Sequence, residues 1–272
     1  YELFIRRKMT LEALFAVSVL CLGGIYSLVL PPLSAPDEVS HYISAYECSN
    51  RLMGLPSVNE KGLIQIRPED AWLEDVADVL ADDGSAEGGD EKPVILGQSL
   101  TEETYRRIHE ERSGENEAVH RENVQSSSQG AGQMASSYQF SVRTTPLAYW
   151  PQALGFVLAR LLGLGSLVLL YLGRLFNLLF FAATGFLTLR RLPFGKTAVF
   201  AVYLLPMNLH LVSSLSYDVL ITAFCGYFTA VCMDLAYKAD RVKWKDVVLL
   251  AFLLAVMGPC KMVYGVIAGL CL

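Results

Sequence analysis

The stretch LEALFAVSVLCLGGIYSLVL, residues Leu11–Leu30, decides the fold class. An α-helix needs roughly 20 apolar residues to cross the hydrocarbon core of a bilayer, and this stretch has that length. A cleaved signal peptide has a shorter apolar core followed by small residues, whereas this stretch runs into two prolines at 31 and 32. The basic run at residues 6–8 therefore predicts a retained membrane anchor whose N-terminus lies in the cytoplasm.

The composition of the whole chain agrees with a membrane protein. Of its 272 residues 53% are hydrophobic and 18% are charged, with a mean hydropathy of +0.38. The apolar residues fall in blocks, and the net charge of -5 comes largely from one polar stretch. No basic tract is interleaved with aromatic residues, which argues against nucleic-acid binding. Only Cys48 of the six cysteines lies in the polar stretch, so the sequence predicts neither a disulfide within it nor a zinc site.

The basic residues decide how many apolar segments cross the membrane after the polar stretch. If all five segments crossed, the basic clusters at 190–196 and 238–245 would lie outside, against the positive-inside rule. Both clusters return to the cytoplasm if residues 146–162 do not cross. That segment is short, begins TPLAYWP and carries Arg160, which favours an amphipathic helix in the outer interface. We therefore predict five crossings in all.

The predicted architecture is an all-α polytopic membrane protein with a large external loop between its first and second transmembrane helices. Its parts are a cytoplasmic N-terminus (1–10), transmembrane helix 1 (11–31), the external loop (32–145), a juxtamembrane interfacial helix (146–164), and transmembrane helices 2 (165–190), 3 (196–213), 4 (216–238) and 5 (246–272). The last segment ends without a polar flank, and we expect the chain to be a fragment of a longer protein.

The external loop begins with a predicted helix over 34–50. Ser34 and Asp37 have the spacing of a helix-start box, and Pro36 suits a first helical turn. Inserts near 75–92 and 113–137 are rich in acidic, Gly, Ser and Gln residues, which predicts poor order. A short solvated helix is expected at 101–112.

Asp37, Glu38 and His41 are the first candidates for chemistry. On a helix Asp37 and His41, four apart, share a face, and Glu38 lies beside them. Two acids at a helix N-terminus can simply complement the helix dipole. Alternatively, a carboxylate at the membrane surface can take a proton from an incoming hydroxyl group.

Ionisable residues within the predicted transmembrane helices are the second group. Asp218 lies at the outer start of its helix, Arg174 near the outer third of another, and Lys261 well inside the last apolar segment after Gly258-Pro259, which permits a helix break. The two cations could bind a phosphate, or could form structural pairs with the acids. The predicted topology places all these residues, with Asp37, Glu38 and His41, at one external site.

The ordered motifs resemble the GT-C superfamily of membrane glycosyltransferases, and most of all a bacterial branch described only as predicted membrane proteins of unknown function. The motifs are PPLSAPDEVSHY after the first helix, TPLAYWPQALGFVLARLLG, LGRLFNLL, LLPMNLHLVSSLSYD, and the K-x-x-Y of Lys261 and Tyr264. They cover most of the chain outside the loop inserts, and the inserts depart from a compact family loop.

The resemblance implies an inverting transferase in the bacterial cytoplasmic membrane that acts on the external face. It would move a sugar from a polyprenyl-phosphate-linked donor to a cell-envelope glycan acceptor. Asp37 would be the general base, and Glu38 would orient the acceptor or help to bind a divalent metal, which the sequence does not require. The substrate-binding residues would be His41, Arg174, Asp218, Lys261 and Tyr264.

Two other functions remain open on the sequence. A transporter or flippase for a lipid-linked glycan would also place charges among the helices, but transporters more often have repeated halves, and no internal repeat is present. A non-catalytic subunit for envelope assembly could use the acidic loop for docking; the Asp37, Glu38 and His41 cluster beside the membrane counts against it.

Overall fold

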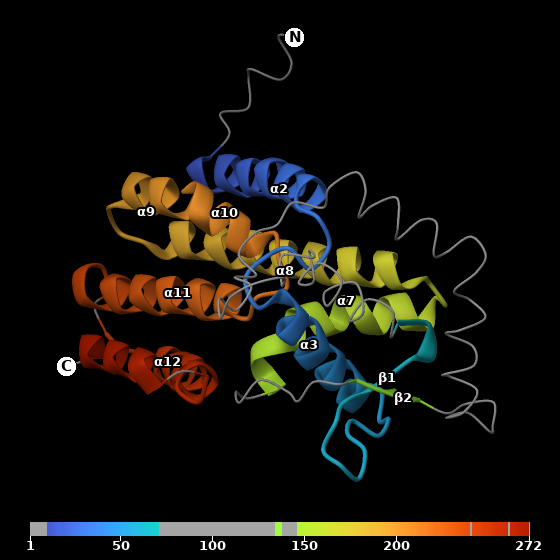
Figure 1. The fold of residues 1–272 in the computed structure, drawn as a ribbon. Coiled ribbons are helices and arrows are strands. Elements are labelled where there is room, and N and C mark those ends of the chain that lie inside the picture. The colour runs from blue at the N-terminus through green and yellow to red at the C-terminus, as the bar shows by residue number, and fades with distance from the viewer. Residues whose placement is uncertain (1–9, 71–133, 138–145, 240, 261, 272) are drawn as a thin grey trace, which may run out of the picture. The chain divides into compact units, whose positions relative to one another are not determined.

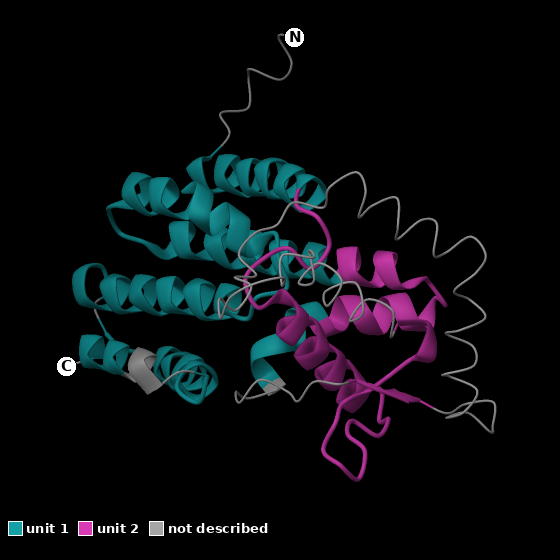
Figure 2. Cartoon of the chain, viewed as in Figure 1, with its two compact units in different colours: residues 1–29, 143–152, 173–272 teal, residues 30–142, 153–172 magenta. Residues whose placement is uncertain are grey.

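The computed structural model describes residues 10–70, 134–137, 146–239, 241–260 and 262–271. These residues form two compact units (Figure 2). Unit 1 comprises residues 1–29, 143–152 and 173–272, and unit 2 comprises residues 30–142 and 153–172. Figure 1 gives the order of the elements along the chain. Each unit is described by itself below.

Unit 1 is built from apolar helices. Three helices of the described chain are long and apolar enough to cross a membrane: α2 (Leu11–Val29), α8 (Ser166–Arg191) and α11 (Asp218–Tyr237). Residues 166–172 of α8 belong to unit 2. The bounds of these helices differ by no more than two residues at either end from the crossings predicted at 11–31, 165–190 and 216–238. The chain is thus mainly helical, as the sequence predicted.

Two predicted transmembrane helices are each broken in the structure. The segment 196–213 forms α9 (Lys196–Tyr203) and α10 (Pro206–Val212), because Pro206 has no N–H to continue the first helix. The segment 246–272 forms α12 (Trp244–Met257) and the 3-10 helix η3 (Met262–Cys271). The second break includes Gly258 and Pro259, where the sequence permits one.

Aromatic rings form the centre of unit 1. The ring of Phe15 on α2 lies 6.4 Å from that of Phe181 on α8 and 5.8 Å from that of Tyr203 on α9, centroid to centroid. All three side chains are buried. A Cβ added to Gly185 would collide with the Phe15 ring, so glycine permits this close approach between α8 and α2.

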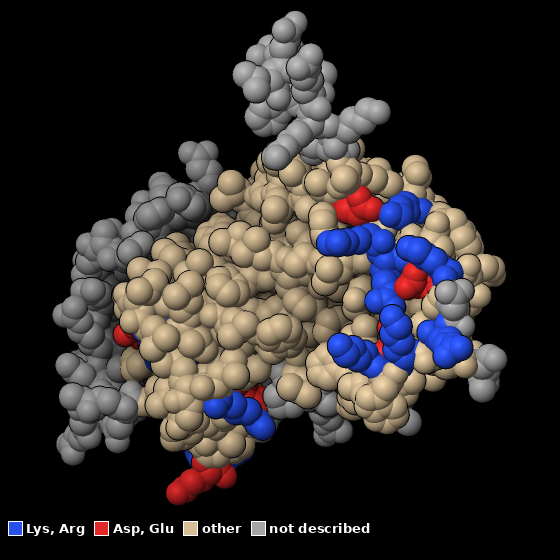
Figure 3. Space-filling model, turned by 180° about the vertical axis from the view of Figure 1, so that it is seen from behind, with Lys and Arg blue, Asp and Glu red and all other residues tan. Residues whose placement is uncertain are grey.

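One end of unit 1 gathers basic side chains, which we call the basic end (Figure 3). Its described members are Arg190, Arg191, Lys196, Lys238, Arg241, Lys243 and Lys245. Arg191 binds Asp234 at 2.5 Å and Asp246 at 2.8 Å, and Lys196 binds Glu12 at 2.6 Å. The pairs of Arg191 join the last turn of α8 to the last turn of α11 and the first turn of α12, and the pair of Lys196 joins the first turns of α9 and α2. Both basic clusters thus lie at the end of unit 1 where the first helix starts. The side of the membrane that this end faces stays a prediction.

Unit 2 is a smaller assembly around α3 (Glu38–Leu52). It includes residues 153–161 of α7 (Trp150–Leu161), which follows the 3-10 helix η2 (Pro146–Tyr149). A two-stranded antiparallel sheet pairs β1 (Gln65–Ile66) with β2 (Ala135–Ser136), and the 3-10 helix η1 (Pro68–Asp70) follows β1. This small sheet departs from the predicted all-α chain, and β2 lies in the part of the second insert that is described. The rest of that insert, the insert near 75–92 and the helix expected at 101–112 lie outside the described residues.

Candidate functional site

The helix that carries the Asp-Glu pair begins later than predicted. The sequence indicated a helix from residue 34, but α3 begins at Glu38, and the Ser34 hydroxyl donates to the carbonyl of Pro31 at 2.8 Å. Asp37 is the N-cap residue, with φ 55° in the left-handed region and no side-chain capping bond. Its carboxylate is exposed. Asp37 therefore precedes the helix, and the shared helical face that was predicted for Asp37 and His41 does not form.

The segment before α3 has an uncommon backbone conformation. Leu33 and Asp37, with φ 59° and 55°, are the non-glycine residues at positive φ in the described chain. Asp tolerates this region, whereas it is a costly conformation for Leu. Such outliers cluster at functional sites, where the surrounding structure holds them in place. The motif PPLSAPDE is thus a shaped loop that presents the Asp37 carboxylate.

Glu38 is placed differently from its neighbour. Its side chain is only 1% exposed, and Oε2 accepts a hydrogen bond from the backbone N–H of Ala35 at 3.2 Å. This bond closes the turn of residues 35–38 before α3, and it has the spacing of the capping box that was predicted one residue earlier, between Ser34 and Asp37. His41 is buried, and its backbone N–H donates to the carbonyl of Asp37 at 3.0 Å. The two acids thus have different environments: Asp37 faces solvent, and Glu38 stabilises the loop.

A buried polar cluster holds α3 against the rest of unit 2. The Tyr46 hydroxyl donates to Asp70 Oδ2 at 2.7 Å and accepts from the Arg67 backbone N–H at 3.0 Å. Arg67 Nε binds the same Asp70 oxygen at 2.7 Å, and its Nη2 also donates to the carbonyl of Leu164 at 3.1 Å. Burial, followed by the charge of Asp70, raises the pKa of Tyr46 above its ordinary value. The cluster fixes the loop of residues 64–70 on α3.

Arg160 of α7 completes this support. Its guanidinium lies 4.7 Å from the centroid of the Tyr46 ring, and Nη1 donates to Ser49 Oγ and Asn50 Oδ1, both at 2.8 Å. Burial lowers the pKa of Arg160. The sequence marked Arg160 as a cation in an apolar helix but gave no sign of its partners. Arg67, Asp70 and Tyr46 were not singled out, because no local pattern distinguishes them from ordinary loop and helix residues.

In unit 1, Arg174 contacts the end of the first helix. Its side chain is fully buried, and Nη1 donates to the carbonyl of Ser27 near the C-terminus of α2 at 3.2 Å. Cations stabilise helix C-termini, where carbonyl groups lack helical partners. Arg174 thus makes a structural contact with a backbone carbonyl, which differs from the ion pair with an acid that was considered in the sequence analysis.

Two buried amide side chains hold the turn that precedes Asp218. Asn177 Nδ2 donates to the carbonyls of Ser214 and Ser216 at 2.8 and 3.2 Å. Gln152 Nε2 donates to the carbonyls of Leu215 and Ser216 at 3.2 and 3.0 Å. The backbone N–H of Asp218 donates to Ser216 Oγ at 3.3 Å. Gln152 was missed from the sequence; a lone amide within an apolar segment was its only signal.

The predicted site residues thus form two groups. Asp37, Glu38 and His41 lie together at the start of α3 in unit 2. Arg174 and Asp218 lie in unit 1, far from its basic end. Arg191 follows Arg174 by 17 positions along α8, about 25 Å at helical rise, and Asp218 is the first residue of α11, whose other end is followed by Lys238.

The meeting of the two groups at one site stays a prediction. Lys261 lies outside the described residues, and Tyr264 is described only as backbone of η3. Among the described side chains, no group of three or more His, Cys, Asp and Glu residues is placed to hold a metal ion.

Comparison with known proteins places the chain in a family. The comparisons with curated proteins and with solved structures gave no match. The family of predicted membrane proteins DUF2142 matches residues 20–272, nearly the whole chain. This range includes α3, the turn before Asp218 and every predicted site residue. The chain therefore belongs to the DUF2142 family of predicted membrane proteins.

Proposed function

We propose that this chain is part of a GT-C-type membrane glycosyltransferase that uses a polyprenyl-phosphate-linked sugar. Asp37 takes the proton from a hydroxyl group of the envelope glycan acceptor. The acceptor oxygen then attacks the anomeric carbon, and the bond from that carbon to the phosphate oxygen breaks. The electron pair of that bond leaves with the polyprenyl phosphate. A single direct displacement of this kind inverts the anomeric centre.

The observation that carries the proposal is the contrast between Asp37 and Glu38. A general base must reach a hydroxyl group of the substrate, and the Asp37 carboxylate is exposed and makes no capping bond. The neighbouring carboxylate is buried and bonded to Ala35. The positive φ of Leu33 and Asp37 adds support, since a costly backbone conformation favours a role beyond helix capping.

The donor is expected at the end of unit 1 opposite the basic end. If the basic end faces the cytoplasm, Arg174 and Asp218 lie near the external interface, where a lipid-linked phosphate would arrive. Arg174 and Lys261 then stabilise the charge that develops on the leaving phosphate. His41, Asp218 and Tyr264 complete the proposed substrate contacts. The N-terminus is cytoplasmic and the loop of residues 32–145 external in this arrangement.

Complementation in cells that lack the gene tests the proposal. The full-length protein is expressed as wild type, Asp37→Asn, Glu38→Gln or Glu60→Gln, at matched membrane levels, and the envelope glycan is analysed for its sugars. Glu60 is an exposed carboxylate of the same unit, so Glu60→Gln controls for the loss of a surface charge.

We expect wild type and Glu60→Gln to restore the missing sugar and Asp37→Asn to fail. Glu38→Gln should lower the amount of folded protein in membranes, because the amide is a weaker acceptor for the Ala35 N–H. Full restoration by Asp37→Asn would contradict the role of the base and would favour transport or assembly. A flippase would instead leave the lipid-linked sugar in the inner leaflet when the gene is deleted.

A further inference from the structure

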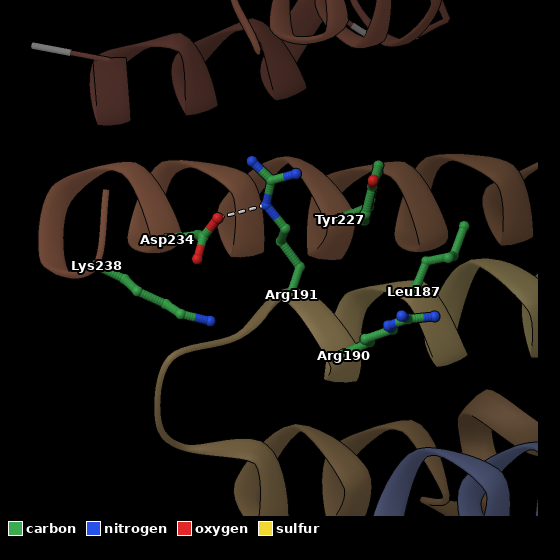
Figure 4. A pocket seen from close by; sticks show the side chains of 6 residues that line it. All are labelled: Leu187, Arg190, Arg191, Tyr227, Asp234 and Lys238. Carbon is green, nitrogen blue, oxygen red and sulfur yellow. Dashed lines mark hydrogen bonds and ion pairs between the residues drawn. The ribbon is translucent and has the colours of Figure 1, made fainter. Parts of the chain in front are cut away.

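A pocket opens at the basic end of unit 1, between α8 and α11 (Figure 4). Its volume is about 350 Å³, and it is lined by Leu187, Arg190, Arg191, Tyr227, Asp234 and Lys238. Arg190 and Arg191 are the last residues of α8, and Lys238 follows the last residue of α11. Since α8 and α11 are candidate transmembrane helices, the pocket lies at the depth where lipid head groups meet the protein.

Two of the cations at this pocket are available to a ligand. Arg191 is held by Asp234 and Asp246, so its charge is already neutralised. Arg190 and Lys238 are exposed and, within the described part of the chain, have no ion-pair partner. Figure 4 shows the Lys238 side chain leaving the end of α11 and the Arg190 side chain running along α8, below Leu187.

The charge around the pocket also favours an anion. The described part of the basic end carries seven basic side chains against the carboxylates of Glu12, Asp234 and Asp246, which leaves an excess of four positive charges. Phosphate groups bind where several Lys and Arg side chains can donate to their oxygen atoms. The ligand chemistry is therefore that of a phosphate anion.

The shape of the pocket distinguishes a lipid from a soluble phosphate. Tyr227 precedes Lys238 by 11 residues, so the lining extends about 16 Å along α11, from the head-group level towards the middle of the membrane. Leu187 and Tyr227 form its deeper part, and Leu187 is 46% exposed. Cations at the head-group level, with Leu187 and the ring of Tyr227 deeper along the helices, match a phosphate head group that continues into acyl chains.

We propose that this pocket binds the phosphate head group of an anionic membrane phospholipid through Arg190 and Lys238, with its acyl chains against Leu187 and Tyr227. This lipid site is separate from the proposed catalytic site and does not depend on the glycosyltransferase function.

Native mass spectrometry of the full-length protein in detergent tests the proposal by titration with phosphatidylglycerol. The variants are Arg190→Gln, Lys238→Gln and the double variant. Arg241→Gln is the matched control, because Arg241 is an exposed cation of the same end that does not line the pocket. Separate titrations use phosphatidylcholine, and inorganic phosphate is added in large excess as a competitor.

Each pocket variant should raise the Kd for phosphatidylglycerol by about five-fold and the double variant by about 25-fold, as expected for loss of one cation and of two. Arg241→Gln should change the Kd by less than about two-fold, and inorganic phosphate should not displace the lipid. If Arg241→Gln weakens binding as much as Arg190→Gln, the attraction belongs to the whole basic end and the pocket proposal is overturned. Displacement by inorganic phosphate would overturn the assignment to a lipid. If Arg190→Gln does not fold, the same question is decided by comparing the Kd of Lys238→Gln with that of Arg241→Gln.

Discussion

Gln152 and Asn177 should be energetically coupled, because both donate to the carbonyl oxygen of Ser216. The perturbation is a pair of substitutions that keep side-chain volume and remove the amide, Gln152→Met and Asn177→Leu. In either single variant the Ser216 carbonyl keeps one donor. In the double variant this buried oxygen loses both, and no other donor to it is present among the described residues.

The magnitude follows from counting the hydrogen bonds in each variant. A buried hydrogen bond contributes about 1 kcal/mol net to the stability of a protein. Values measured for side-chain hydrogen bonds within membranes average about 0.6 kcal/mol. Each single variant removes two hydrogen bonds, so at the membrane value of about 0.6 kcal/mol per bond we expect it to lower the free energy of unfolding by about 1 kcal/mol. The double variant should lower it by about 3 kcal/mol, which exceeds the sum, because a buried carbonyl without any donor costs about 1 kcal/mol more. Changes in cavity volume and in side-chain polarity cancel in the cycle.

The assay is reversible unfolding of the purified full-length protein in mixed micelles with increasing sodium dodecyl sulfate, followed by circular dichroism. A control cycle combines Gln152→Met with Asn208→Leu, since Asn208 donates to the carbonyl of Val202 and shares no acceptor with Gln152. The control cycle should be additive within about 0.5 kcal/mol. Additive or less than additive losses for Gln152 and Asn177 would refute the shared support of the Ser216 turn.

Three further predictions concern thiol reactivity, pH dependence and packing. Burial raises the pKa of Cys48 to about 11 from the ordinary value of 9.0, so at pH 8 the fraction of thiolate is about 100-fold lower than for a free thiol. The rate of alkylation of Cys48, measured by mass spectrometry, should be lower by at least the same factor. The pKa of Tyr46 is higher in the folded than in the unfolded protein, so the stability that this group contributes is complete below pH 10 and is lost as the pH rises above it. In Tyr46→Phe, which also loses the hydrogen bond to Asp70, the free energy of unfolding should therefore fall less steeply with alkaline pH than in wild type. Gly226→Ala should lower the free energy of unfolding by about 1–3 kcal/mol, because the added Cβ collides with the hydroxyl of the buried Tyr203.

Each of these three predictions has a control or an outcome that would contradict it. Alkylation of Cys48 should reach the free-thiol rate after unfolding, and rapid reaction in the folded protein would show that the side chain is not buried. A Tyr46→Phe variant with the same alkaline loss as wild type would assign that loss to other groups. Gly24→Ala places its Cβ in open space and should be neutral or stabilising. Equal effects of Gly24→Ala and Gly226→Ala would contradict the close contact at Tyr203.

The helices could be predicted because each membrane-spanning segment appears in the sequence as a long apolar block. Leu11–Leu30 and the segments around α8 and α11 needed only length, hydropathy and basic flanks. The break before Pro206 follows from an elementary rule on proline that the hydropathy argument did not apply. The start of α3 was placed too early because Ser34 and Asp37 have the spacing of a capping box, while the contact is made by Glu38 on Ala35.

The contacts that support the candidate site could not be predicted, because they join distant parts of the chain. Asn177 and its acceptor at Ser214 are 37 residues apart, and Gln152 and its acceptor at Leu215 are 63 apart. Arg160 reaches Ser49 across 111 residues. An amide or a guanidinium in an apolar helix signals that a partner exists, but the partner is a backbone carbonyl or a common hydroxyl, which no sequence pattern marks.

Transfer by the purified full-length protein tests the central claim most directly. Lipid-linked sugars accumulated by cells that lack the gene are extracted and incubated with acceptor glycan and with wild type or Asp37→Asn. The release of polyprenyl phosphate is then followed by mass spectrometry. We expect wild type to release it and Asp37→Asn to be at least about 100-fold slower at equal amounts of folded protein, as for the loss of a general base. Release at the wild-type rate by Asp37→Asn would contradict the account.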